Sequence, residues 1–297
     1  MVTIAESDAR RLTRIDPPSR RALVAFLSSP RYEVLPTDDV EQRVVAVVPL
    51  EVTITVTASP RRGIEATIDL AQRLAQRGYR VVPHISARLI RDESHLKGVL
   101  DALAAMGAKD AFVVAGDANE PAGDFPDSVS LLEAMKAAHS LTDIGVTGYP
   151  ERHSFIDDDL TIQAMWDKRR LATYIVSNLC FDTRVVKKWV GRVRRRGVQL
   201  PIYIGMAGVA DPAKLLRISS RIGVVDSARF LRGHSNWFLR MLQPGGYSPE
   251  RFVTGLLPDL AGPDRKVAGL HVFTFNEIES TERWRQEILA RLAAGSA

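Results

Sequence analysis

The segment RYEVL (31–35) carries one glutamate, Glu33, among residues typical of a buried strand. Successive side chains of a strand point to opposite faces, so Glu33 lies opposite Tyr32 and Val34. If helices cover those two residues, Glu33 points into the protein interior, where an ionised carboxylate is costly unless it is protonated or paired. A carboxyl group kept protonated by burial can serve as a general acid. The alternative is a structural glutamate paired with Arg31 or with an interior lysine.

Asp117 and several other polar residues lie at the ends of later apolar segments. Asp117 follows AFVVAG (111–116), where Gly116 would let a ligand approach the backbone closely, although an aspartate there can also cap the next turn. Asn178 offers a donor and an acceptor, which suit the edge of a heterocycle and equally a satisfied core amide. The remaining candidates are Thr53, Thr55 and Thr57 in the second segment, His84 in the third, and Tyr149, Glu151 and His153 after the fifth. Each of these residues alone also has a structural explanation. Threonine, for example, is common in strands whatever its function.

These residues belong to a chain in which strand-like and helix-like segments alternate. Short runs rich in β-branched residues predict eight strands, and apolar residues three and four apart predict helices. The strand segments are RYEVL (31–35), LEVTITVT (50–57), RVVPHIS (80–86), AFVVAG (111–116), DIGVTG (143–148), TYIVSNLC (173–180), LPIYIGM (200–206) and GLHVFTF (269–275). The helical segments are RRALVAFLSS, 63–78, 93–107, 128–140, 160–170, 183–197, 211–223, DSARFLRGHSNWFLRML, PERFVTGLLPDL and ESTERWRQEILARLAA.

This alternation predicts an α/β protein with a parallel sheet and right-handed crossovers. Eight units most simply close into a (β/α)8 TIM barrel, whose chemistry collects at the C-terminal ends of the strands. An open doubly wound sheet is the alternative, but no glycine-rich phosphate fingerprint follows the first strand. We predict a single barrel domain over residues 30–297, preceded by an N-terminal helical extension at residues 1–29.

The composition narrows the class of protein. Of its residues, 45% are hydrophobic and 25% are charged, a composition that excludes a disordered or fibrous protein. With 297 residues, the chain is long enough to form a hydrophobic core without a metal or a disulfide. Its one cysteine, Cys180, excludes an internal disulfide and a thiolate zinc site, and no metal is expected. We find neither a signal peptide nor an apolar run of about 18 residues, so we expect a cytoplasmic protein without membrane contact.

A basic run lies between Thr183 and Ala210, with seven Lys or Arg residues and no acidic one. Such a run could bind polyanions, but it is more often the solvated face of an outer helix. Trp189 is the one aromatic residue close to these charges, so we expect small-molecule substrates and no nucleic-acid partner.

Seven fragments, although each is weak alone, occur in an order typical of one family. They are YEVLP, VTITVT, PHISA, AGD, GYPERH, DKRRLATYIVSNLCFD and GLHVFTFN. Together they resemble the methylenetetrahydrofolate reductases over nearly the whole chain. The resemblance implies reduction of 5,10-methylenetetrahydrofolate to 5-methyltetrahydrofolate.

The resemblance also implies roles for individual residues. Glu33 would be the general acid that protonates N10, and Asp117 would stabilise the iminium cation at N5. Thr55 corresponds to a threonine of the family, and Asn178 replaces the glutamine that touches the pterin. Lys214 is one basic candidate for binding the glutamate tail of the folate.

Differences from the family gather where it holds FAD. Ala115 replaces an arginine, Thr147-Gly148 replaces Ala-Ala, and a Gly-Ala turn is lost around Leu171. A flavin-independent subgroup of the family is therefore the better match. It implies NADH as the direct hydride donor and no FAD. The sequence does not distinguish NADH from NADPH. The residues expected to bind the nicotinamide co-substrate are His84, Gly116, Thr147, Tyr149, His153 and Lys168. The alternatives are an FAD-dependent reductase with an altered flavin pocket and a non-catalytic pterin- or folate-binding barrel.

Overall fold

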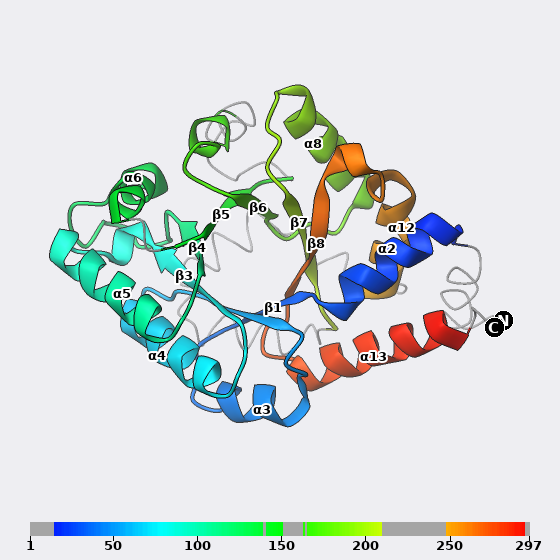
Figure 1. The fold of residues 1–297 in the computed structure, drawn as a ribbon, viewed down its shortest axis with the longest axis horizontal. Helices are drawn as coiled ribbons and strands as arrows, with labels where there is room; N and C mark the ends of the chain where they lie inside the picture. The colour runs from blue at the N-terminus through cyan, green and yellow to red at the C-terminus, as the bar shows by residue number, and fades with distance from the viewer. Residues whose placement is uncertain (1–14, 139–140, 151–162, 164, 210–247, 295–297) are drawn as a thin grey trace.

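The computed structural model describes residues 15–138, 141–150, 163, 165–209 and 248–294. Eight parallel strands close into a barrel in chain order, because β1 pairs with β8 as well as with β2 (Figure 1). The strands are β1 (Arg31–Val34), β2 (Thr53–Val56), β3 (Val81–Ser86), β4 (Asp110–Val114), β5 (Asp143–Gly148), β6 (Tyr174–Ser177), β7 (Ile202–Ala207) and β8 (Val267–Phe273). Each overlaps its predicted segment, so the (β/α)8 barrel is confirmed and the open sheet is wrong.

Helices surround the strands on the outside of the barrel (Figure 1). They are α2 (Pro17–Ser28), α3 (Val40–Val47), α4 (Gly63–Gln76), η1 (Ala87–Leu89), α5 (Glu93–Ala105), α6 (Ser128–Ala138), α8 (Thr183–Arg195), α12 (Pro249–Leu260), η3 (Pro263–Arg265) and α13 (Ile278–Ala294). The helix predicted at 160–170 is described only in part, with residues 163 and 165–168 helical. The helices predicted at 211–223 and in DSARFLRGHSNWFLRML lie outside the described residues.

The sequence analysis missed helix α3. Its sequence, VEQRVVAV, contains four valines, a residue type that favours strands, and it is only about two turns long. Val40 and Val44 are both fully buried and lie four residues apart. This spacing is the helical signal that the valine content concealed.

The N-terminal end of the barrel is closed by a buried polar cluster. Arg31 forms an ion pair with Asp110 at 3.1 Å and lies over the rings of Tyr174 and Tyr203. The Tyr174 hydroxyl donates to Asp110 at 2.7 Å, and burial raises the pKa of this aspartate to about 6. Because Arg31 is engaged with Asp110, the alternative that pairs it with Glu33 is wrong.

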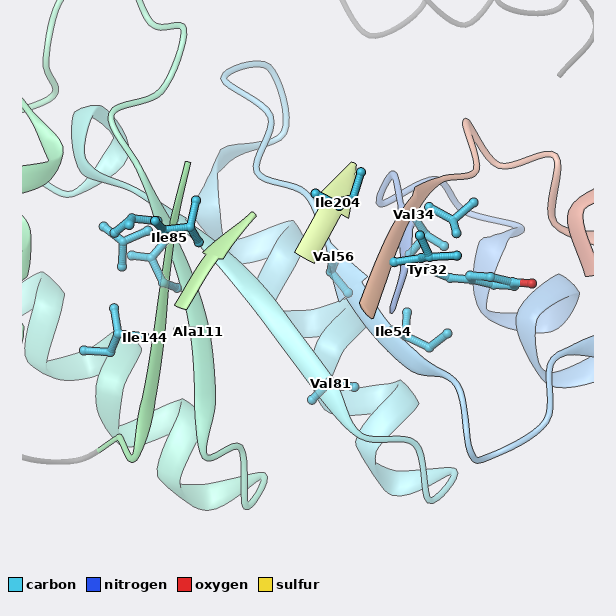
Figure 2. Packing of buried hydrophobic residues seen from close by; sticks show 14 of the residues in the cluster. Tyr32, Val34, Ile54, Val56, Val81, Ile85, Ala111, Ile144 and Ile204 are labelled. Atoms are coloured by element: carbon cyan, nitrogen blue, oxygen red, sulfur yellow. The ribbon is translucent and has the colours of Figure 1, made fainter. Parts of the chain in front are cut away.

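The other face of β1 packs against the outer helices, as predicted. Tyr32 and Val34 are each 1% exposed and belong to the main hydrophobic cluster, part of which is drawn in Figure 2. The Tyr32 hydroxyl donates to Glu282 of α13 at 3.0 Å, and Glu282 forms a buried ion pair with Arg285 at 2.8 Å. With Tyr32 and Val34 turned outward, Glu33 points into the barrel.

Candidate active site at the mouth of the barrel

Glu33 lies inside the barrel near its C-terminal end. Its strand neighbours in register are Thr55 of β2 and Phe273 of β8. The carboxyl oxygen Oε2 lies 3.0 Å from Nε2 of His271 and 3.8 Å from Nε2 of His84. The side chain keeps 16% of its surface exposed, so the carboxyl remains reachable from the open end. This position fits the predicted general acid.

Burial controls the protonation of these three groups. It raises the pKa of Glu33 to about 7, and the nearby His84 only partly offsets this rise. Burial also lowers the pKa of His84 to about 4 and that of His271 to about 3. Near neutral pH both imidazoles are therefore uncharged, while the carboxyl is shared between its neutral and ionised forms. A carboxyl group in this state can both give and recover a proton.

The sequence analysis did not select His271. A neutral imidazole can accept a hydrogen bond from protonated Glu33 at Nε2 or donate one to ionised Glu33, according to its tautomer. His271 is 238 residues from Glu33 in the chain and becomes its neighbour because the barrel closes β8 onto β1. The sequence feature that could have identified His271 is its position on the inward face of the last strand.

The loop after β8 holds the end of β1 in place. The hydroxyl of Thr274 donates to the carbonyl of Glu33 at 2.6 Å. The side-chain amide of Asn276 accepts from the backbone of Leu35 at 2.9 Å and donates to Thr37 at 3.0 Å. Asn276 thus fixes the segment that follows Glu33.

Asp117 lies in the loop after β4, which a neighbouring loop holds firmly. Arg88 of η1 donates to the backbone carbonyls of Ala118 at 2.7 Å, Asn119 at 2.6 Å and Pro126 at 3.1 Å. The sequence analysis missed Arg88, since its role depends on backbone carbonyls of another loop. Asp117 is exposed at the C-terminal end of the barrel, where a substrate can reach it.

Tyr149 lies close to Asp117 at the end of β5. Its pKa is raised by burial and by the charge of Asp117, and its hydroxyl is hydrogen-bonded to Thr147. The structure thus brings together three of the predicted residues. Gly116, before Asp117, has a φ of 95°, and a β-carbon there would collide with the hydroxyl of Ser86, so close packing already requires glycine.

Thr55 of β2 pairs in register with Glu33, and Thr57 follows directly after this strand. The Thr55 hydroxyl is buried and donates to the carbonyl of Tyr32 at 3.4 Å. Thr57 lies one step nearer the mouth, and its buried hydroxyl has no hydrogen-bond partner among the described residues. Nε2 of His84 is likewise buried and without a hydrogen bond there. Such groups are expected to bind a ligand or water, which favours Thr57 over the predicted Thr55 as the hydroxyl available to a substrate.

Of the remaining predicted residues, the structure describes Asn178 and Lys168. Asn178 is exposed after β6, and its backbone amide donates to the carbonyl of Gly148 at 2.6 Å. Lys168 is half-buried, and burial lowers its pKa while the charge of Asp127 opposes this change. His153 and Lys214 lie outside the described residues.

The basic run forms the outer helix α8. Its buried side is apolar, with Val186, Trp189 and Val193 in the core, whereas Lys188 and Arg195 are exposed. The predicted solvated face of an outer helix is therefore confirmed. A hollow of about 530 Å³ beside this helix is lined by Val185, Lys187, Lys188, Gly191, Arg192, Arg195 and Arg265, and contains none of the candidate residues.

Two further searches cover the described part of the chain only. Within it, His, Cys, Asp and Glu residues form no group of three or more arranged to hold a metal ion. Within the same residues, no helix combines the length and the apolar character that crossing a membrane requires.

A closed parallel barrel with a buried acid at its C-terminal mouth has the architecture of a barrel enzyme. Residues 37–225, more than half of the chain, match the family of methylenetetrahydrofolate reductase. The chain belongs to this family, which makes it an oxidoreductase of the methylenetetrahydrofolate reductase type with a folate as its small-molecule substrate.

Two solved structures resemble the chain more distantly. Tryptophan synthase from M. tuberculosis is 13% identical with a TM-score of 0.48, and the match covers 95% of this chain and 98% of that one. A protein described as a lyase/mutase from Burkholderia cenocepacia is 14% identical with a TM-score of 0.47, covering 93% and 88%. At this level of similarity neither match bears on function.

Proposed function

We propose that the protein reduces 5,10-methylenetetrahydrofolate to 5-methyltetrahydrofolate with NADH as the direct hydride donor and Glu33 as the general acid. The observation that carries the proposal is the buried carboxyl of Glu33, with a pKa of about 7, at the open end of the barrel. A general acid works best when its pKa lies near the working pH.

The proton and the hydride enter the folate at different atoms. Glu33 protonates N10, the bond between N10 and the methylene carbon breaks, and an iminium cation forms at N5. The carboxylate of Asp117 opposes this positive charge. The hydride of NADH then reduces the methylene carbon to a methyl group, and Glu33 recovers a proton from water. Overall, one NADH and one proton are consumed.

His271 and His84 assist Glu33 as neutral groups. Because neither imidazole is charged near neutral pH, neither holds the carboxyl in its ionised form. The hydrogen bond between His271 and Glu33 fixes the orientation of the carboxyl without removing its proton. Nε2 of His84 and the hydroxyl of Thr57, which form no hydrogen bond among the described residues, supply polar contacts for the bound substrates.

The loop after β4 supports the flavin-independent assignment. FAD carries a pyrophosphate, which needs cationic or backbone donors. Ala115 offers no charge where the family resemblance places an arginine. The nearby Arg88 donates to Ala118, Asn119 and Pro126 and so has its guanidinium engaged with carbonyls. The described residues of this loop therefore fit a flavin pyrophosphate poorly.

The test is NADH oxidation driven by methylenetetrahydrofolate, with no added flavin. We expect the wild type to turn over, and Glu33→Gln to lose roughly 10²–10⁴-fold in kcat because the proton donor is gone. Wild-type kcat should fall as the pH rises through about 7, where Glu33 loses its proton. The control is Glu51→Gln, which changes an exposed glutamate and should keep full activity.

Two results would overturn parts of the proposal. Unchanged turnover by Glu33→Gln would remove Glu33 as the acid. A purified protein that is yellow, with absorbance near 450 nm, and that needs this flavin for turnover would show the FAD-dependent alternative.

A further inference from the structure

Phe275, just after β8, has a backbone conformation that is unusual for its residue type. Its φ is 51°, in the left-handed region, and among the described residues only Lys266 and Asn276 are other non-glycine residues with positive φ. Asparagine tolerates this region, but a bulky aromatic residue there is a clear outlier. Strain of this kind persists where neighbouring contacts enforce it, and it gathers at functional sites.

The contacts that enforce the conformation come from the strand of the proposed acid. On one side of Phe275, Thr274 donates to the carbonyl of Glu33 at 2.6 Å. On the other side, Asn276 accepts from Leu35 at 2.9 Å and donates back to the carbonyl of Leu35 at 3.1 Å. Phe275 is thus held between two anchors, one on β1 and one on the residue that follows this strand, and cannot relax alone.

The ring of Phe275 lies with the aromatic side chains that surround Glu33. Its centroid is 6.5 Å from that of Phe273, with 29° between the planes, and Phe273 lies 4.9 Å from His271. Phe273 and Phe275 are both half-buried, and neither ring packs against the described hydrophobic clusters. Apolar rings left partly open at the end of a barrel are suited to contact a ligand.

We propose that the ring of Phe275 is a stacking surface for the planar heteroaromatic ring of a bound substrate, beside the carboxyl of Glu33. The proposal rests on the proposed function, in which a pterin and a nicotinamide must meet near this carboxyl. Stacking on an aromatic side chain strengthens the binding of a heterocyclic base by roughly 5- to 150-fold.

The test compares Phe275→Gly, Phe275→Tyr and a matched control, Lys266→Gly. Lys266 also has positive φ, at 48°, but it is exposed and belongs to the turn before β8, at the opposite end of this strand. The probes are tetrahydrofolate alone and NADH alone, titrated calorimetrically against each protein, with Tm measured on the same samples. These binding measurements need no turnover.

We expect Phe275→Gly to weaken binding of at least one probe by about tenfold or more, with Tm unchanged or raised because glycine relieves the backbone. Phe275→Tyr keeps a ring and should restore the affinity. Lys266→Gly should also keep or raise Tm, with both affinities unchanged. Loss for tetrahydrofolate identifies the folate as the stacked ligand, and loss for NADH identifies the nicotinamide nucleotide.

Either of two results would overturn the proposal. One is a Phe275→Gly protein that keeps both affinities within twofold. The other is a Phe275→Gly protein whose Tm falls by several degrees while Phe275→Tyr fails to restore the affinity, which indicates a structural role. If wild type binds the probes but shows no NADH oxidation with methylenetetrahydrofolate, the proposed function fails while the stacking surface can still be demonstrated.

Discussion

At the scale of single residues, burial decides the chemistry of the site. His271 and His84 both lie within hydrogen-bonding or ion-pairing reach of Glu33, yet burial favours the neutral form of all three groups. In a more solvated site the histidines would hold the glutamate ionised. The barrel interior instead leaves a proton on the carboxyl near neutral pH, at a cost in stability that varies with pH.

This cost predicts how stability depends on pH. The pKa of Glu33 is about 7 in the folded protein against an ordinary value of 4.5, so between these pH values the folded state binds more protons than the unfolded state. The unfolding free energy of the wild type therefore falls as the pH rises from about 4.5 to about 7, because the unfolded state releases the Glu33 proton more readily. Glu33→Gln has no carboxyl at this position and does not show this fall. The measurement is chemical denaturation of both proteins at pH 5, 6, 7 and 8. Between pH 5 and pH 8 the unfolding free energy of Glu33→Gln should rise relative to that of the wild type by on the order of 2–3 kcal/mol.

Both proteins contain the two histidines, so most of the histidines' own pH dependence cancels in the comparison; Glu33→Gln removes only the charge that raises the pKa of His84 in the wild type. Their lowered pKa values destabilise both proteins on acidification below about 6.5, with the loss growing toward their folded values. A stability difference that stays constant from pH 5 to 8 would contradict the raised pKa of Glu33.

At the scale of elements, loops set the relative positions of Glu33 and Asp117, the two proposed catalytic groups. The turn after β8 binds the end of β1 through Thr274 and Asn276. The η1 turn binds the Asp117 loop through Arg88, whose planar guanidinium reaches three carbonyls from one side chain. Each loop is thereby positioned by a neighbouring strand connection rather than by its own sequence.

We expect Arg88→Met to reduce kcat roughly tenfold to a hundredfold, because small displacements of a catalytic group are costly. Arg88→Lys should recover only part of the loss, since an ammonium group cannot span three carbonyls. If Arg88 acts by positioning Asp117, adding Arg88→Met to Asp117→Asn should cause little further loss of kcat. Independent, multiplicative losses in the double variant would contradict this coupling.

At the scale of the whole molecule, α2 is packed into the structure around the barrel. It lies against α12 and α13, and Leu23 and Leu27 are at most 1% exposed (Figure 1). The side chain of Arg285 in α13 donates to the carbonyl of Leu27 at 2.7 Å, and Arg20 of α2 donates to the carbonyl of Leu292. The helix predicted as part of an N-terminal extension therefore contributes to the same core as the barrel strands.

Truncation of this helix core should lower stability without changing the chemistry. Leu23→Ala is expected to cost roughly 2–5 kcal/mol in unfolding free energy, measured by chemical denaturation, because it leaves a cavity in a closed core. The control in the same helix is Val24→Ala, at a side chain 37% exposed, which should change stability by about 0.5 kcal/mol or less. Equal effects of the two substitutions would show that α2 is not firmly packed.

The sequence alone predicts the strand order, the inward face of β1 and the place of Glu33, because these follow from local alternation and from the two-residue period of a strand. It also gave Asp117, Thr147 and Tyr149, which lie at strand ends and meet at the mouth. It missed α3, whose valines favour a strand when tertiary contacts are ignored. Lys214 and His153 stay predictions.

Which side chains contact one another depends on the closed barrel and could not be predicted from the sequence. His271 is 238 residues from Glu33, and no local pattern encodes a contact that exists only when β8 closes onto β1. The engagement of Arg31 with Asp110 likewise depends on strands across the barrel from one another. The physical reason is that pKa values and ligand contacts depend on burial and distance, which are properties of the closed barrel rather than of any segment of the chain.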